Sequence, residues 1–261
     1  MSTPHVQFET HGSRAVVTFN RPGARNAMTW PMYEALVEHC ATVDGDDAIR
    51  VLILRGAGGR AFVAGTDIAQ FRDFTTAADG LAYEQRLDAV VDRLEAVSKP
   101  TIAQIDGVAT GGGCALAAAC DLRVCTPQSR FGIPIARTLG NCLSAANHAR
   151  LLDLIGPARL KELLFTGRLL DAEEAAAAGL VNRIAAADSL DAVVQEYAET
   201  MAANAPLTIR ATKEMVRRIQ AHRRIAPDAG RDLIVRCYTS ADFHEGVDAF
   251  LAKRAPQWTG A

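Results

Sequence analysis

Short apolar runs of β-forming residues alternate with amphipathic segments through the first half of the chain, and this alternation most constrains its fold. Residues 51–54 are continuously apolar and end at a glycine-rich turn, which is typical of a strand buried on both faces. Residues 101–105 and 121–125 are similar runs, and segments with helical periodicity lie at about residues 29–44 and 81–97. Strands that alternate with helices predict βαβ units, and hence an α/β core.

The two ends of the chain extend this pattern. At the start, His11-Gly12-Ser13 separates two β-rich runs and predicts a hairpin. In the second half, Asp171 and Glu174 form a capping-box pattern, and helical periodicity continues over residues 190–203 and 208–219. Without a linker between the halves, we expect a core over residues 1–190. Residues 191–261 are then a helical region that packs on the core or on a neighbouring subunit.

Composition excludes several classes of function. The chain has 28 basic and 30 acidic residues, so its near-neutral charge argues against a dedicated nucleic-acid binder. Its six cysteines form no CxxC pair and no histidine pair has zinc spacing, so we expect reduced thiols and no metal site. A polar N-terminus and the lack of a long apolar run predict a cytoplasmic protein with no membrane segment.

Two glycine turns stand where chemistry is most expected. Phe62–Asp67 passes from a strand through Gly65 toward a helix, and Asp106–Cys114 does the same through three successive glycines. Unpaired backbone N–H groups at a helix start stabilise negative charge. Close packing alone could also require such glycines, so spacing leaves open whether the two turns converge.

A series of motifs in order along the chain resembles the crotonase (enoyl-CoA hydratase/isomerase) superfamily. The resemblance covers residues from about 20 to 254. Besides the two glycine turns, its motifs are Asn20-Arg21-Pro22, Asn26-Ala27-Met28, Lys99-Pro100, Cys120-Asp121, Phe131-Gly132-Ile133-Pro134, Thr166-Gly167-Arg168, Gly179-Leu180-Val181-Asn182 and Ala249-Phe250-Leu251-Ala252-Lys253-Arg254.

The resemblance implies a ClpP/crotonase-like spiral of ββα units with a C-terminal helical trimerisation region. It also implies a homotrimer or a hexamer built as a dimer of trimers, and a coenzyme A thioester as substrate, with no further cofactor. By motif position, the backbone N–H groups of Thr66 and Gly112 form the oxyanion hole. The CoA-binding positions are then Ala24, Arg25, Ala64, Thr66, Phe250 and Lys253.

The sequence departs from the hydratases of this family at their two catalytic glutamates. The first would follow the glycine turn, where this chain has Ala115. The second would follow Phe-Gly-x-Pro, where it has Ile135 and Ala136 in a loop that is one residue longer than usual. None of these alkyl side chains transfers a proton, so hydration lacks both of its acid–base groups.

Polar residues remain on the same loop. Arg137 and Asn141, with Thr138 beside them, are candidates to face the acyl group, although Asn and Thr at such turns also serve as ordinary local structure. Cys142 can act as a nucleophile only if a neighbour lowers its pKa. For Asp67 and Asp121 the resemblance implies a place in turn and core motifs rather than a role in catalysis.

Two functions remain open. The first is an acyl-CoA enzyme that uses the oxyanion hole for decarboxylation, hydrolysis or other enolate chemistry. The alternative is a catalytically silent subunit of crotonase fold that binds CoA thioesters.

Overall fold

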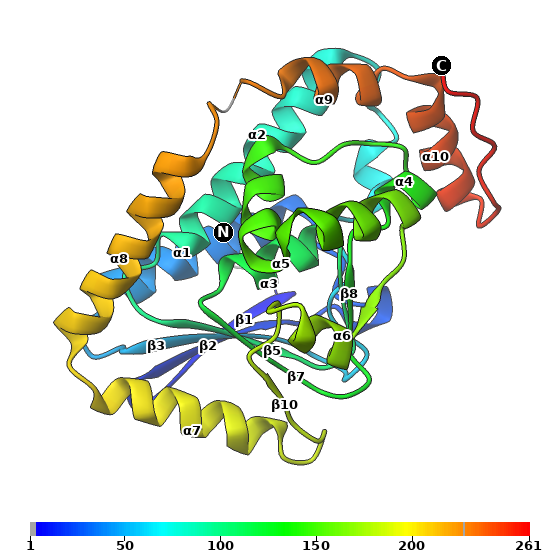
Figure 1. Ribbon diagram of the computed structural model, residues 1–261. Helices are drawn as coiled ribbons and strands as arrows, with labels where there is room; N and C mark the ends of the chain where they lie inside the picture. The colour runs from blue at the N-terminus through cyan, green and yellow to red at the C-terminus, as the bar shows by residue number, and fades with distance from the viewer. Residues whose placement is uncertain (1–3, 227) are drawn as a thin grey trace.

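Two sheets joined by a repeating strand–strand–helix connection build the core of the computed structural model, which describes residues 4–226 and 228–261 (Figure 1). The larger sheet has the order β1-β2-β3-β5-β7-β10 and the smaller one β4-β6-β8-β9, so successive pairs such as β3–β4 and β5–β6 add one strand to each. The strands are β1 (Val6–His11), β2 (Arg14–Phe19), β3 (Val51–Gly56), β4 (Ala61–Val63), β5 (Thr101–Ile105), β6 (Val108–Thr110), β7 (Leu122–Cys125), β8 (Arg130–Gly132), β9 (Leu170–Asp171) and β10 (Arg183–Ile184).

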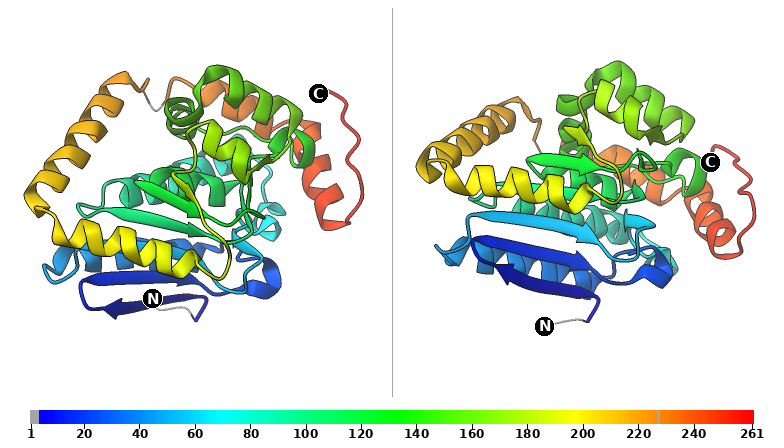
Figure 2. Two further views of the ribbon diagram at one scale, coloured as in Figure 1. Left: turned by 60° about the horizontal axis from the view of Figure 1, so that its bottom comes forward. Right: turned by 90° about the horizontal axis from the view of Figure 1, so that it is seen from below.

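Helices cover both faces of the larger sheet (Figure 2). The main core lies between this sheet and α1, α2 and α3, while α7 covers the opposite face through Leu190, Val194 and Ala198. The helices are α1 (Trp30–Gly45), α2 (Ala77–Glu95), α3 (Gly112–Ala119), α4 (Ile135–Thr138), α5 (Ala145–Thr166), α6 (Ala172–Ala177), α7 (Leu190–Ala203), α8 (Pro206–Arg223), α9 (Arg231–Tyr238) and α10 (Ala241–Leu251), with 3-10 turns η1 (Pro22–Ala24) and η2 (Ile68–Phe71).

The α/β prediction is confirmed, together with most of its local details. The hairpin pairs β1 with β2 antiparallel, and β2, β3, β5 and β7 are parallel neighbours, as buried apolar runs predict. Asp171 and Glu174 form the expected capping box of α6. Thr29 is the N-cap residue of α1, but its side chain makes no capping hydrogen bond there.

The C-terminal helices differ in what they bury. The apolar stripe of α7 does not need a second subunit, because the larger sheet covers it. By contrast, α8 has no buried residue and stands away from the sheets (Figures 1 and 2). None of the helices in the described residues is both long and apolar enough to cross a membrane.

Candidate active site

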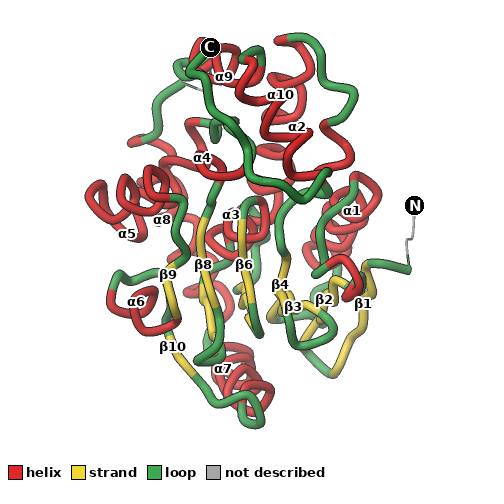
Figure 3. Tube along the Cα trace, turned by 90° about the vertical axis from the view of Figure 1, so that its right-hand side faces the viewer, coloured by secondary structure: helices red, strands yellow, loops and turns green. Residues whose placement is uncertain are grey.

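A cavity of about 440 Å³ lies beyond the carboxyl ends of β4 and β6, which run parallel with Val63 beside Ala109. Figure 3 shows these two strands next to each other, with α4 and α10 toward the same end of the smaller sheet. Because the ends of parallel neighbouring strands meet at one edge, the loops that follow them converge. Both glycine turns therefore line this cavity.

The backbone amides of Thr66 and Gly112 lie close together. The Thr66 nitrogen is 3.8 Å from the position that a Cβ on Gly112 would occupy, and the Gly112 nitrogen is 3.9 Å from that of a Cβ on Gly65. Among the described residues, neither N–H donates to a backbone carbonyl. The cavity thus has two adjacent, unpaired hydrogen-bond donors in its wall.

The two donors arise differently. Gly112 is the first residue of α3, as the sequence predicts. Thr66 instead forms an isolated parallel bridge with Met28 and is followed by the short 3-10 turn η2. The expectation that an α-helix begins at this turn is therefore wrong.

The three glycines of the second turn have separate roles. Gly111 has φ of 54°, a conformation that side chains disfavour, and a Cβ on Gly113 would collide with the Val63 carbonyl. Packing and backbone conformation thus explain these two. A Cβ on Gly112 would meet the Tyr33 hydroxyl at 2.8 Å, inside the wall of the cavity. Gly112 thus combines a tight approach with an N–H that donates to no backbone carbonyl and lines the cavity.

Two buried tyrosines hold the Thr66 turn in place, and no sequence motif pointed to them. The Thr66 Oγ1 lies 2.9 Å from the Tyr33 hydroxyl and 2.8 Å from the Tyr83 hydroxyl. Burial raises the pKa of both phenols, so both remain neutral hydrogen-bonding groups. Anchoring the side chain of Thr66 fixes the direction of its backbone N–H.

The positions where the family resemblance implies a hydratase's glutamates have apolar side chains. Ala115 of α3 and Ile135 of α4 both line the cavity, whereas Ala136 is exposed and does not. A carboxylate at either lining position would stand in the cavity wall. In this chain those positions offer only methyl and sec-butyl groups.

The polar loop residues separate in the structure. Asn141 and Thr138 line the cavity, but the Thr138 hydroxyl donates to the Pro134 carbonyl at 2.9 Å. The hypothesis for Arg137 needs correction: its side chain is exposed outside the cavity and packs where Gly167 has no Cβ. Cys142 lies outside the lining, and its hydrogen bond with Cys237 and its burial raise its pKa, which argues against a nucleophile.

Most of the expected CoA-binding positions gather at the mouth of the cavity. Ala24, Arg25, Ala64 and Phe250 line it, and the Ala64 N–H donates to the Arg25 carbonyl at 3.1 Å. Arg25 is exposed and has no ion pair within the described residues, so its charge is available to a phosphate. Lys253 does not line the cavity and is exposed beyond the end of α10.

Sequence reasoning missed an acidic residue in this cavity. Glu84, on the inner face of α2, lines this cavity and is only 2% exposed. Burial raises the pKa of Glu84 to about 8, and the nearby charge of Asp88 adds to this shift. Hydrogen bonds from Tyr238 and from the Ser144 N–H act in the opposite direction and lower it. One signal could have revealed it: Glu84 falls on the apolar stripe of α2 with Leu87 and Val91.

Other charged candidates have structural partners. Asp67 accepts from Arg21 at 2.7 Å, and Asp121 accepts from Thr101 and from Lys213, the latter at 2.7 Å. Basic side chains at and just beyond the end of α8 are also paired: Arg217 and Arg218 with Glu214, and Arg224 with Glu95. Within the described residues no group of three His, Cys, Asp or Glu is placed to hold a metal ion.

Comparisons with known proteins agree with this geometry. The profile of the enoyl-CoA hydratase/isomerase family matches residues 9–261. The chain is 32% identical to a short-chain-enoyl-CoA hydratase of Clostridium acetobutylicum over 97% of each chain, and 34% identical to a 2,3-dehydroadipyl-CoA hydratase of Escherichia coli over 94% of each.

Solved structures show the same fold across the chain. A methylmalonyl-CoA decarboxylase in complex with 2-nitronate-propionyl-CoA matches with a TM-score of 0.91 and 26% identity over 100% of both chains. An enoyl-CoA hydratase/carnitine racemase of Magnetospirillum magneticum matches with a TM-score of 0.81 and 37% identity, over 100% of this chain and 97% of that one.

Proposed function

This chain belongs to the enoyl-CoA hydratase/isomerase family, whose members act on acyl-CoA thioesters, and from that premise we propose that it stabilises a thioester enolate without hydrating a double bond. One observation carries the proposal. The same cavity presents two unpaired amides, from Thr66 and Gly112, and alkyl groups at both positions where a hydratase needs carboxylates. The site can therefore bind an oxyanion but lacks the means to activate a water for addition.

Decarboxylation of a carboxyacyl-CoA is the reaction that these residues support best. The electron pair of the breaking C–C bond moves to the thioester oxygen, where two preorganised N–H donors stabilise the charge as CO₂ leaves. The α-carbon then takes one proton. The apolar wall formed by Ala115 and Ile135 favours the loss of a charged carboxylate as a neutral molecule. The likeness to methylmalonyl-CoA decarboxylase over the whole chain supports the same reaction.

A catalytically silent CoA-thioester-binding subunit is the second candidate, favoured by the same alkyl groups. Incubation with a panel of carboxyacyl-, enoyl- and saturated acyl-CoA thioesters, followed by mass spectrometry, separates the two. We expect loss of CO₂ from a carboxyacyl-CoA. Binding that stabilises the protein against heat, without a mass change in any thioester, would establish the silent subunit instead.

Gly112→Ala tests the role of the paired amides. The added methyl would stand 2.8 Å from the buried Tyr33 hydroxyl, so the turn has to shift and move the Gly112 N–H away from its place beside the Thr66 N–H. We expect turnover of the active thioester to fall by roughly 10²–10³-fold, the usual effect of losing one oxyanion donor. Gly23→Ala is the matched control, because a Cβ there meets nothing within 4 Å. Equal turnover by both variants would remove the paired amides from the mechanism.

We also propose that the protein assembles as a homotrimer or a hexamer through α8. Met215, Val216 and Ile219 of this helix are exposed on one side of it, and clustered apolar surface of this kind marks an interface. We expect light scattering at micromolar concentration to give three or six times the monomer mass. Met215→Gln with Ile219→Gln should lower that mass, whereas Arg210→Gln on the opposite helix face should not. A monomeric wild type would contradict the proposal.

A further inference from the structure

We propose that Glu84 is the proton-transfer residue of this cleft, exchanging a proton between the α-carbon of the bound acyl group and solvent in a second cavity behind it. The inference rests on the proposed function, because it requires an enolate held at Thr66 and Gly112. It adds the acid–base group that neither the family's motif positions nor the loop residues provide.

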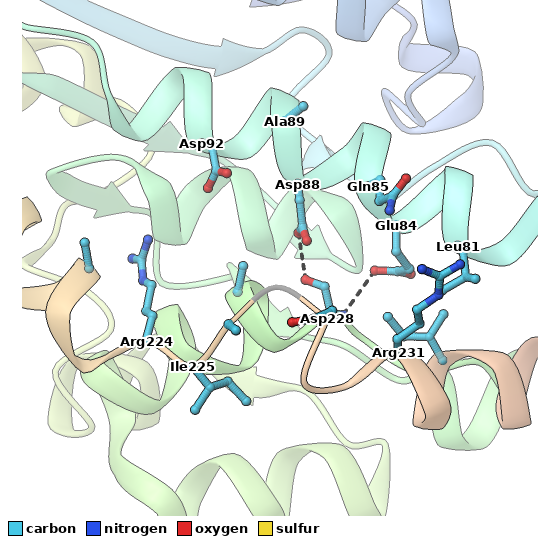
Figure 4. A pocket seen from close by; sticks show the side chains of 15 residues that line it. Leu81, Glu84, Gln85, Asp88, Ala89, Asp92, Arg224, Ile225, Asp228 and Arg231 are labelled. Carbon is cyan, nitrogen blue, oxygen red and sulfur yellow. Dashed lines mark hydrogen bonds between the residues drawn. The ribbon is translucent and has the colours of Figure 1, made fainter.

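Glu84 lies between two cavities. It lines the first with Thr66, Gly112 and Ala115, and it also lines a second cavity of about 620 Å³ between α2 and the segment that follows α8. Figure 4 shows this second cavity, with Glu84 and Asp88 on one face of α2 and Arg224 and Arg231 across from them. A carboxyl group at this position faces the acyl end on one side and a polar, solvent-sized space on the other.

Hydrogen bonds hold the carboxyl group in this position from two elements. The Tyr238 hydroxyl of α9 donates to Glu84 Oε1 at 2.6 Å, and the Ser144 N–H, just before α5, donates to Oε2 at 3.1 Å. Ser144 Oγ donates in turn to Asp88 Oδ1 at 2.6 Å. The acid is therefore held in a fixed orientation, as proton transfer at a defined carbon requires.

Asn141 connects the same group to the acyl end. Its Nδ2 donates to the Tyr238 hydroxyl at 3.0 Å, while its buried Oδ1 has no hydrogen-bond partner within the described residues. An unpaired buried acceptor is costly unless a ligand or another state of the network uses it. When Glu84 is protonated, its O–H can donate to the Tyr238 hydroxyl. A 180° flip of the Asn141 side-chain amide then lets Oδ1 accept the hydrogen bond that the Tyr238 hydroxyl donates. The three side chains thus accommodate Glu84 with or without its proton.

The surroundings of Glu84 set its pKa near neutral pH. Glu84 has no ion pair with Arg, Lys or His among the described residues. The titratable groups around it are Tyr33 on α1, Tyr83 and Asp88 on α2, Tyr238 on α9, Cys142 before α5 and Arg231 across the second cavity. Burial raises the pKa of Glu84 to about 8, so both forms are present at physiological pH, which suits a general acid or base.

The proton balance closes for both directions of transfer. After CO₂ leaves, neutral Glu84 gives its proton to the enolate α-carbon, becomes a carboxylate and recovers a proton from water in the second cavity. In the reverse sense, the Glu84 carboxylate takes the α-proton of a saturated thioester, and the electron pair of the C–H bond moves to the oxyanion. Return of a solvent proton then exchanges hydrogen at the α-carbon without net reaction.

The experiment measures this exchange. Butyryl-CoA is incubated with the full-length protein in D₂O, and deuterium at its α-carbon is followed by mass spectrometry from pH 5 to pH 9. For the wild type we expect exchange whose rate rises with pH and levels off above about 8. Glu84→Gln should slow it by roughly 10²–10⁴-fold and abolish this pH dependence. Glu196→Gln, the same change at an exposed position on α7, should leave rate and profile unchanged.

A second variant keeps the carboxyl group. Tyr238→Phe removes a donor that stabilises the charged form of Glu84, so we expect the midpoint of the profile to move to higher pH. Exchange by Glu84→Gln at the wild-type rate, or an unmoved midpoint in Tyr238→Phe, would overturn the role of Glu84 while leaving the enolate site intact. A wild type that binds butyryl-CoA but neither exchanges nor transforms any thioester would overturn the proposed function as well.

Discussion

Crotonyl-CoA hydration is expected to be at least about 10⁴-fold slower with this protein than with the short-chain-enoyl-CoA hydratase of Clostridium acetobutylicum, its 32% identical relative. Addition of water across the double bond needs one group to take a proton from water and a second to deliver one to the α-carbon. Ala115 and Ile135, which line the cavity at the family's acid positions, do neither. Loss of the ultraviolet absorbance of the conjugated enoyl thioester, with both proteins side by side, measures the difference.

Glu84 does not restore hydration, because it is a single carboxyl group whose pKa of about 8 leaves it mostly neutral at pH 7. A neutral acid cannot take a proton from the attacking water. The double variant Ala115→Glu with Ile135→Glu places carboxylates on both lining positions and should recover a measurable part of the rate. Efficient hydration by the wild type would instead show that other groups activate the water and that the absence of the two glutamates has no catalytic consequence.

Local sequence rules predicted the parts of this site that depend on strand ends and glycine turns. Gly65 and Gly112 follow β-rich runs, and such turns end parallel strands wherever the sheet is assembled. That the turns meet depends on β4 and β6 being neighbours in the smaller sheet, which the family resemblance supplied and periodicity did not. The resemblance likewise directed attention to Ala115 and Ile135.

Long-range packing decides which loop side chains line the cavity and which acidic residue reaches it. Arg137 and Thr138 are adjacent in sequence, yet one is exposed and the other lines the cavity, because the short helix α4 turns their side chains apart. Glu84 reaches the site from the middle of α2, and its partner Tyr238 lies 154 residues further along the chain. Helical periodicity could place Glu84 on a buried face, but only the docking of α9 shows what that face meets.

The buried state of Glu84 also has a consequence for stability, which we expect to fall by about 4 kcal/mol from pH 5 to pH 9 through this group alone. In the unfolded chain the carboxyl group loses its proton near pH 4.5, whereas the folded protein holds it until about pH 8. Between these values the native state binds more protons than the unfolded state, so the free energy of unfolding decreases as the pH rises. Above the folded pKa the loss is complete.

Denaturant unfolding of the wild type and Glu84→Gln at several pH values measures this contribution. A neutral amide has no proton to lose, so we expect the variant to equal the wild type to within about 1 kcal/mol at pH 5 and to exceed it by about 4 kcal/mol at pH 9. Glu196→Gln, an exposed position on α7, should follow the wild type throughout. Parallel loss of stability in the wild type and Glu84→Gln would mean that Glu84 is ionised in the folded protein. It would then be a base at all pH values above 5, with no proton to give the enolate at pH 7.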